Sequence, residues 1–224
     1  MIITIKMYSM KKIMFNDKYG LTQAVLDGRK TMTRRIIKCP RTFRGEWVAG
    51  FNIHRRHSDK KIVDWPCMYD ADEREFDMGE ILPKYELGEV VAIAQSYKDS
   101  GYDSDSLDRH PKDLSIRGLM KDSAGWNNKM FVKSYACKHH IKITNVKIER
   151  LQDISDEDCL KEGVIHAYTD NNGIKIYHTP HTKRGYLSTD VAQEAFAALI
   201  DKVSGKGVFQ SNPFIFAYEF KLID

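Results

Sequence analysis

The sequence has no long uninterrupted hydrophobic run. No apolar stretch in its 224 residues approaches the roughly 18 residues that a membrane span requires, and the mean hydropathy is −0.48. The N-terminal residues 1–15 are apolar but interrupted by Lys6, Lys11 and Lys12, and no small-residue cleavage site follows them, so a secretory signal is not indicated. We therefore expect a cytoplasmic protein that does not bind a membrane.

Cysteine is scarce and widely spaced. The four cysteines form no C-x-x-C pair; they are Cys39, Cys67, Cys137 and Cys159. In a chain of this length, which can bury a hydrophobic core, this predicts free thiols in a reducing compartment and no disulfide framework.

A zinc site is a weak alternative. Cys39, His54, His57 and Cys67 occur in an order that a tetrahedral site would accept, and His178-x-x-His181 follows later. However, 14 residues separate Cys39 from His54 and 9 separate His57 from Cys67, which matches no compact zinc finger. We expect no metal and no other cofactor.

Three common sequence motifs are also missing. The glycines of Gly205-Lys-Gly207 lack the spacing of a dinucleotide-binding loop or a P-loop. No G-x-S-x-G motif is present. These absences argue against a P-loop nucleotidase and against an ordinary α/β-hydrolase.

Acidic residues are few in the first quarter of the chain. Residues 1–61 hold 15 Lys/Arg and 4 Asp/Glu, whereas the remainder holds 20 and 27. A basic block of this kind is typical of a protein that binds a polyanion, although a solvated basic surface is the alternative.

Apolar periodicity predicts four strands and three helices. The strands are residues 33–37, 88–95, 140–151 and 213–223, and the helices are residues 19–26, 155–163 and 190–201. We expect Ser155 and Asp190 to cap their helices and a bulge near Asn145. Residues 41–84 and 96–125 lack a sustained period and predict short elements and a loop. No βαβ rhythm occurs, which favours an α+β domain or a small, mainly antiparallel barrel.

The strongest chemical cluster lies at residues 28–35, Gly-Arg-Lys-Thr-Met-Thr-Arg-Arg. In an extended chain Lys30 and Thr33 face opposite ways, so a bend near Thr31 is needed to bring them together. Neighbouring arginines disfavour the ammonium form of Lys30, which would make it a usable base beside a hydroxyl. Glu162 is an available carboxylate. Phosphate binding and solvent exposure of these basic residues are the alternatives.

Four motifs together resemble the ASCH-domain family of PUA-like β-barrels, and its phage and prophage members most. They occur in family order as LDGRKTMTRR (26–35), GEVVAI (88–93), ITNVKIERLQDISDEDCLKEG (143–163) and NPFIFAYEF (212–220). The resemblance covers about half of the chain. It implies one domain over residues 1–224, a PUA-like barrel with a few short helices, insertions at about residues 39–86 and 97–125, and a link to RNA.

The resemblance also implies a chemistry. Some bacterial ASCH proteins are amidohydrolases that remove the acetyl group of N4-acetylcytidine with a lysine, a threonine and a glutamate. By motif, these fall on Lys30 as the base, Thr33 as the nucleophile or water positioner, and Glu162, which orients the lysine. The further residues expected to bind substrate or RNA are Arg29, Arg34, Arg35, Trp126, Asn128 and Lys129.

Two other functions stay open at this point. The chain would also suit a non-catalytic RNA-binding module, or a phage protein that binds a host partner through its insertions. The expected ligand is RNA or a modified nucleoside for the amidohydrolase and for the RNA-binding module, and a protein for the phage protein.

Overall fold

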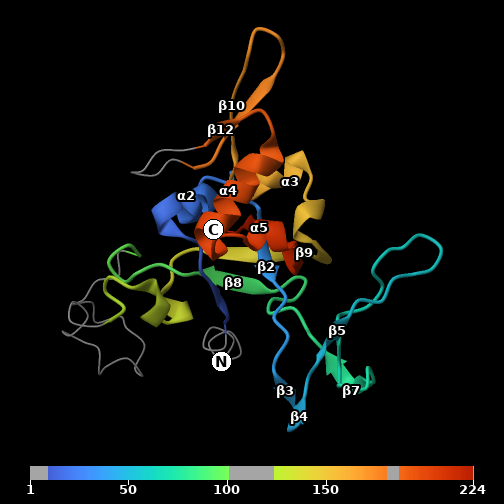
Figure 1. Cartoon of the computed structure of the whole chain (residues 1–224). Coiled ribbons are helices and arrows are strands. Elements are labelled where there is room, and N and C mark those ends of the chain that lie inside the picture. Colours follow the sequence, from blue (N-terminus) through green and yellow to red (C-terminus); the bar gives the residue numbers. More distant parts are fainter. Residues whose placement is uncertain (1–9, 101–123, 181–186, 224) are drawn as a thin grey trace, which may run out of the picture.

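The computed structural model describes residues 10–100, 124–180 and 187–223 of the chain (Figure 1). Its main sheet has five strands in the order β1-β8-β9-β13-β2. Their bounds are β1 Lys12–Ile13, β8 Val90–Ile93, β9 His140–Arg150, β13 Phe214–Leu222 and β2 Met32–Ile36. The pair β1/β8 is parallel, and the other three neighbouring pairs are antiparallel. The predicted mixture of mainly antiparallel strands and few helices is therefore confirmed.

The main sheet is open within the described part of the chain. β1 and β2 are its two edges and are not paired with each other, so these strands do not form the closed barrel that the resemblance implied. β1 is only two residues long, too short to pair along β2. A side-chain hydrogen bond crosses between the edges, from Arg35 Nη2 to the carbonyl oxygen of Met14, the residue after β1, at 2.8 Å.

The closing strand β13 lies inside the sheet, between β9 and β2, and is buried on both faces. Phe216, Tyr218 and Phe220 belong to one hydrophobic cluster with β8 and β9, whereas Ile215 and Ala217 belong to a second cluster. This arrangement follows from the sequence of β13, which has apolar residues on both faces over most of its length. The strand thereby packs the helices against the sheet.

Three α-helices carry or cover the site described below. They are α2 Leu21–Leu26, α3 Asp156–Lys161 and α4 Ala192–Ser204. The second hydrophobic cluster joins α3 and α4 to β13 through buried side chains, among them Cys159 and Phe196. The described residues also contain the short helices η1 Asp17–Tyr19, η3 Lys129–Phe131, η4 Ser134–Ala136, η5 Leu151–Asp153 and α5 Val208–Ser211.

All predicted strands and helices are present, with shifted ends. The bulge is confirmed, because Glu219 pairs with Asn145 and Phe220 with Ile143, which leaves one extra residue on β9. The expected cap at Asp190 is wrong. Helix α4 begins after Val191, whose N–H donates to the hydroxyl of Thr189 rather than to Asp190.

Ser155 caps α3 as predicted, because its Oγ accepts a hydrogen bond of 3.2 Å from the backbone N–H of Asp158. We expect Ser155→Ala to lower the free energy of unfolding by about 1 kcal/mol, since one N–H of the first turn loses its partner. Denaturant unfolding measures the change. Ser155→Thr keeps a capping hydroxyl, so equal losses in both variants would contradict the cap.

The first insertion forms separate small sheets beside the main sheet (Figure 1). Its strands are β3 Thr42–Phe43, β4 Glu46–Trp47, β5 Gly50–Asn52, β6 Cys67–Tyr69 and β7 Glu75–Glu80. It packs on β13 through aromatic pairs, Trp65 with Phe216 at 6.0 Å and Phe51 with Phe214 at 6.3 Å. Most of the second insertion lies outside the described residues.

A further small sheet stands beyond α3 and α4 and consists of β10 Ile165–Thr169, β11 Lys175–His178 and β12 Ser188–Thr189. Its strands were not predicted from the sequence. None of the helices that the described ranges contain is long and apolar enough to cross a membrane.

Candidate active site

Lys30 lies in the short connection between α2 and β2. Gly28 has a φ of 72°, which turns the chain at the end of α2. The backbone N–H of Lys30 then donates to Ala24 at 2.8 Å, and that of Thr31 donates to Lys161 of α3 at 3.0 Å. Lys30 therefore precedes β2 and does not belong to it. The backbone changes direction between Lys30 and β2, as the sequence required if Lys30 and Thr33 are to lie at one site.

The ammonium group of Lys30 is buried against Glu162. The distance from Nζ to Glu162 Oε2 is 2.6 Å, and the distance from Nζ to the backbone carbonyl oxygen of Glu162 is 2.7 Å. The side chains are 3% and 6% exposed, so this is a buried ion pair between residues far apart in the sequence. Two of the three donors of a protonated lysine are thus used.

A glycine is required next to this pair. Gly163 follows the end of α3 with a φ of 106°, and a Cβ there would lie 3.2 Å from Leu21 Cδ2 and 3.8 Å from Lys30 Cδ. Both the left-handed backbone and the close side chains disfavour any larger residue. The turn Glu162-Gly163 is therefore shaped to hold the glutamate against the lysine.

Burial is the main influence on Lys30 and lowers its pKa below the ordinary value of 10.5. Glu162 opposes this shift, and Arg35 and Arg34 add to it to a smaller degree. The neighbouring arginines that the sequence suggested as the cause are thus secondary to the loss of solvent.

Arg34 binds three carboxylates and so connects the Lys30–Glu162 pair to Glu149 and Asp158. Its Nη1 lies 3.2 Å from Glu162 Oε1, and its Nη2 lies 2.6 Å from Glu149 Oε1 and 2.9 Å from Asp158 Oδ2. The Arg34 side chain is 1% exposed. The sequence suggested that Arg34 binds substrate or RNA. The structure instead shows it bonded to Glu162 through Oε1, the carboxylate oxygen that Lys30 does not contact.

A second cation completes the cluster. Lys147 Nζ lies 3.0 Å from Glu149 Oε2 and 3.1 Å from Asp158 Oδ2. Burial alone would raise the pKa of Asp158, but the bonds from Lys147 and Arg34 outweigh burial and hold it below its usual range. Lys30, Arg34 and Lys147 thus face Glu149, Asp158 and Glu162 in a charge-balanced network.

Lys30, Thr33 and Glu162 line the same small cavity, called here the site cavity, together with Arg34, Phe15 and Phe196. Its volume is about 50 Å³. Because one water molecule in the liquid occupies about 30 Å³, this space holds a group of a few heavy atoms and not a nucleoside. Thr33 is 5% exposed, so its hydroxyl is shielded from bulk solvent.

The other predicted binding residues are dispersed. Arg29 is exposed and pairs with Asp27 at 2.9 Å, and Trp126 packs in a separate hydrophobic cluster. Asn128 caps η3 by accepting from the Met130 N–H. Lys129 binds Asp17 at 2.7 Å and donates to the carbonyl of Phe15. None of these four lines the site cavity.

Arg35, also predicted to bind substrate or RNA, does lie at the site. It lines the site cavity and also a larger groove of about 640 Å³. We call this the seam groove, because its lining includes Lys12 of β1 and residues 34–38 of and after β2, the two unpaired edges of the main sheet.

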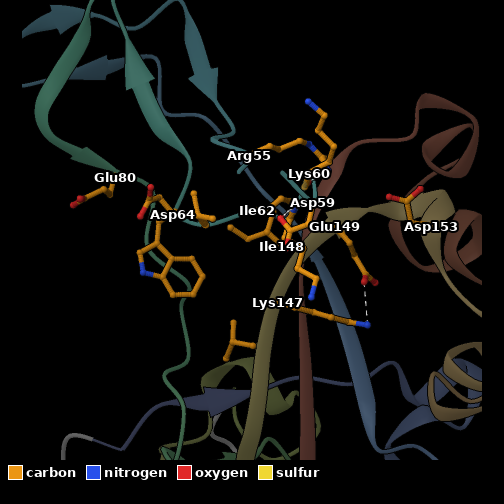
Figure 2. Close-up of a pocket in the computed structure, with 14 residues that line it drawn as sticks. Arg55, Asp59, Lys60, Ile62, Asp64, Glu80, Lys147, Ile148, Glu149 and Asp153 are labelled. Carbon is orange, nitrogen blue, oxygen red and sulfur yellow. Dashed lines mark hydrogen bonds and ion pairs between the residues drawn. The ribbon is translucent and has the colours of Figure 1, made fainter. Parts of the chain in front are cut away.

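A third hollow, the outer cleft, has a volume of about 830 Å³ and lies between the first insertion and β9. Figure 2 shows side chains from both walls, with the Lys147–Glu149 ion pair on the β9 side. This cleft reaches the charge network from outside but does not contain Lys30 or Thr33.

The histidines and cysteines do not gather in the described ranges. No group of three or more His, Cys, Asp and Glu residues there is arranged to hold a metal ion. His54 instead lies 2.8 Å from Glu75, and the cysteines Cys39 and Cys67 are free thiols.

Sequence reasoning missed the carboxylates of the network. Glu149 falls in the predicted strand 140–151 and Asp158 in the predicted helix 155–163, and the sequence assigned neither of them a role in the site. The available signal was the even alternation of β9, which places Lys147 and Glu149 on one face. Only the tertiary structure shows that Arg34 of β2 reaches Glu149 across β13 and also reaches Asp158 of α3.

Comparisons with protein-family models, with curated proteins and with solved structures give no match to this chain.

Proposed function

We propose that the protein is an amidohydrolase that removes the acyl group of an acylated nucleoside such as N4-acetylcytidine. The observation that carries this proposal is the convergence of Lys30, Thr33 and Glu162 on one buried cavity. A base, a hydroxyl and an orienting carboxylate are the parts that covalent acyl transfer needs. The motifs that resemble the ASCH family point to the same three residues.

The bonding of Lys30 suits a base. A neutral amine has two N–H donors and one lone pair, and two donors suffice for the contacts with Glu162 Oε2 and its backbone carbonyl. The lone pair is then available to accept a proton. Burial increases the neutral fraction because it lowers the pKa of Lys30.

The proposed reaction has two stages. The Thr33 hydroxyl attacks the amide carbonyl while Lys30 accepts its proton, and the amide C–N bond then breaks as that proton passes to the leaving amine. Water next attacks the acyl ester on Thr33, which returns the hydroxyl and releases the carboxylic acid. The overall change for N4-acetylcytidine is the addition of one water to give cytidine and acetic acid.

The size of the site cavity supports a small acyl group. An acetyl group has three heavy atoms and fits the volume of about 50 Å³, whereas the pyrimidine and sugar must lie outside it. We also propose that the open sheet corresponds to a PUA-like barrel whose last seam is left unpaired, which would leave room for the nucleoside.

The first test is incubation of the purified protein with N4-acetylcytidine, with conversion to cytidine followed by ultraviolet absorbance. We expect turnover by the natural chain, and a fall of at least about 100-fold in Thr33→Val, which keeps the shape but lacks the hydroxyl. Thr33→Ser is the matched control and should retain turnover. Absence of turnover by the natural chain would reject the enzyme and favour the RNA-binding alternative, and full activity of Thr33→Val would reject the nucleophile.

A further inference from the structure

The seam groove separates the two edges of the main sheet. One wall is β1 and the residues after it, the other is β2, and residues 81–85 from the end of the first insertion lie along it. These last residues are tied to the sheet, because the Tyr85 hydroxyl donates to the Lys12 carbonyl at 3.0 Å and the Lys84 N–H donates to the Tyr218 hydroxyl at 3.0 Å. The groove is therefore a built part of the fold.

The charge of the seam groove has one sign. Five basic residues line it and no acidic residue does; the five are Lys12, Arg34, Arg35, Lys38 and Lys84. The remaining lining is apolar or aromatic apart from Ser204. Clefts lined by one sign of charge concentrate ligands of the opposite sign.

Three of these cations already have partners. Lys12 Nζ donates to the carbonyl oxygens of Lys129, Met130 and Val132, and Arg34 is surrounded by carboxylates. Arg35 Nη2 also donates to a carbonyl oxygen, that of Met14 at 2.8 Å. Within the described ranges, no ion pair joins Arg35, Lys38 or Lys84 to a carboxylate, and both lysines are exposed.

The outer cleft provides the contrast. It is larger, but its four basic residues are accompanied by five acidic ones, and Figure 2 shows one of these, Glu149, paired with Lys147. An anion entering the outer cleft would meet carboxylates, whereas an anion entering the seam groove would not. The charge pattern therefore selects the smaller groove for a negatively charged ligand.

We propose that the seam groove binds the phosphates of a single-stranded RNA whose acylated nucleoside is presented to the site cavity. The groove and the cavity share Met14, Arg34, Arg35 and Ser204, so they lie next to each other. A volume of about 640 Å³ is within the range of about 300–1,000 Å³ that accommodates ligands larger than one base. Presentation of the reacting nucleoside rests on the proposed amidohydrolase function, whereas phosphate binding does not.

Lys38 and Lys84 are the side chains to test, because they are exposed and lie outside the site cavity. The double variant Lys38→Glu/Lys84→Glu reverses two charges in the groove. Lys175→Glu is the charge-matched control, because Lys175 is an exposed residue of β11 and lines none of the three hollows. Circular dichroism and thermal melting should be unchanged in each, since the substituted lysines are exposed.

Binding of a fluorescent single-stranded RNA of about 12 nucleotides is measured by anisotropy between about 50 and 200 mM salt. We expect the dissociation constant to rise at least about 10-fold in the double variant, and the slope of log K against log salt to fall by about 1.4, or about 0.7 for each lost phosphate contact. Lys175→Glu should bind RNA as the natural chain does. Equal binding by the double variant would overturn the proposal.

Three competitors identify the ligand. If cytidine monophosphate binds as tightly as the strand, the groove is a mononucleotide site. If poly-glutamate competes as well as the strand, the groove attracts acidic polymers without specificity. If duplex RNA binds as tightly as the strand, no free strand is needed. Each of these results would overturn the proposal of a single-stranded RNA.

Catalysis separates this proposal from the proposed function. If both hold, the double variant cleaves free N4-acetylcytidine at the natural rate but loses at least about 10-fold in kcat/KM on an RNA that contains the acetylated base. If the chain binds RNA through the groove but deacylates neither substrate, the enzyme assignment fails while the groove assignment stands. If the chain deacylates the free nucleoside but does not bind RNA, the groove assignment fails while the enzyme assignment stands.

Discussion

Replacing Lys30 with methionine is expected to lower turnover of N4-acetylcytidine by at least about 100-fold, the lower end of the contribution of a general base. Methionine has nearly the length of lysine but cannot accept the proton of Thr33. Initial rates at saturating substrate measure the effect. Lys30→Arg should be equally inactive because a guanidinium stays protonated at all working pH values.

Folding of the Lys30→Met variant has to be verified, because Lys30 lies against a buried carboxylate. Glu162 retains Arg34 at 3.2 Å in this variant, so we expect the chain to remain folded by circular dichroism and thermal melting. A folded variant with natural activity would exclude Lys30 as the base.

The pH profile gives an independent readout of Lys30. A base works in its neutral form, so the rate should rise with pH and level off above the pKa of Lys30. Burial places that pKa below 10.5, and the midpoint of the rise is expected below this value. A rate that falls as pH increases through this range would contradict a lysine base.

Replacing Arg34 with methionine is expected to lower the free energy of unfolding by about 3–5 kcal/mol at neutral pH, as in other cases where one partner of a buried ion pair is removed. Glu149, Asp158 and Glu162 would then share two cations, Lys30 and Lys147. Urea denaturation measures the loss. Arg29→Met is the matched control, because Arg29 makes an exposed pair with Asp27 and should change stability by no more than about 1 kcal/mol.

The loss in Arg34→Met should depend on pH. In the natural chain the pKa of Asp158 lies below its ordinary value of 3.8, so its ionised form stabilises the fold above that value, and this contribution is lost as pH falls through the folded-state pKa. Without Arg34 the pKa of Asp158 rises. The difference between the two chains is therefore expected to be largest near neutral pH and to shrink toward about pH 4, where carboxylates become protonated. A difference independent of pH would show that Arg34 acts through packing alone.

Local elements were predictable because their signals are local. The alternation of β13, the acidic first turn of α3 after Ser155, and the extra residue of β9 near Asn145 are readable in short windows of sequence. The expected cap of α4 failed at Asp190 for a related reason. The N-cap is Val191, whose own N–H bonds the Thr189 hydroxyl, and no side chain caps the first turn. The presence of a capping residue type at Asp190 therefore did not fix where the helix begins.

The sequence by itself determined the residue types of the site and the three-residue spacing of Lys30 and Thr33, and the resemblance of its motifs selected Glu162 from many carboxylates. Tertiary structure alone decided that Arg34 holds carboxylates instead of substrate and that the sheet edges stay apart to form the seam groove. These contacts join residues more than 100 positions apart, such as Lys30 with Glu162 and Arg34 with Glu149. Their geometry depends on the contact of α3 with β2 and on the sheet order, in which β13 lies between β9 and β2. Periodicity in one segment does not encode either.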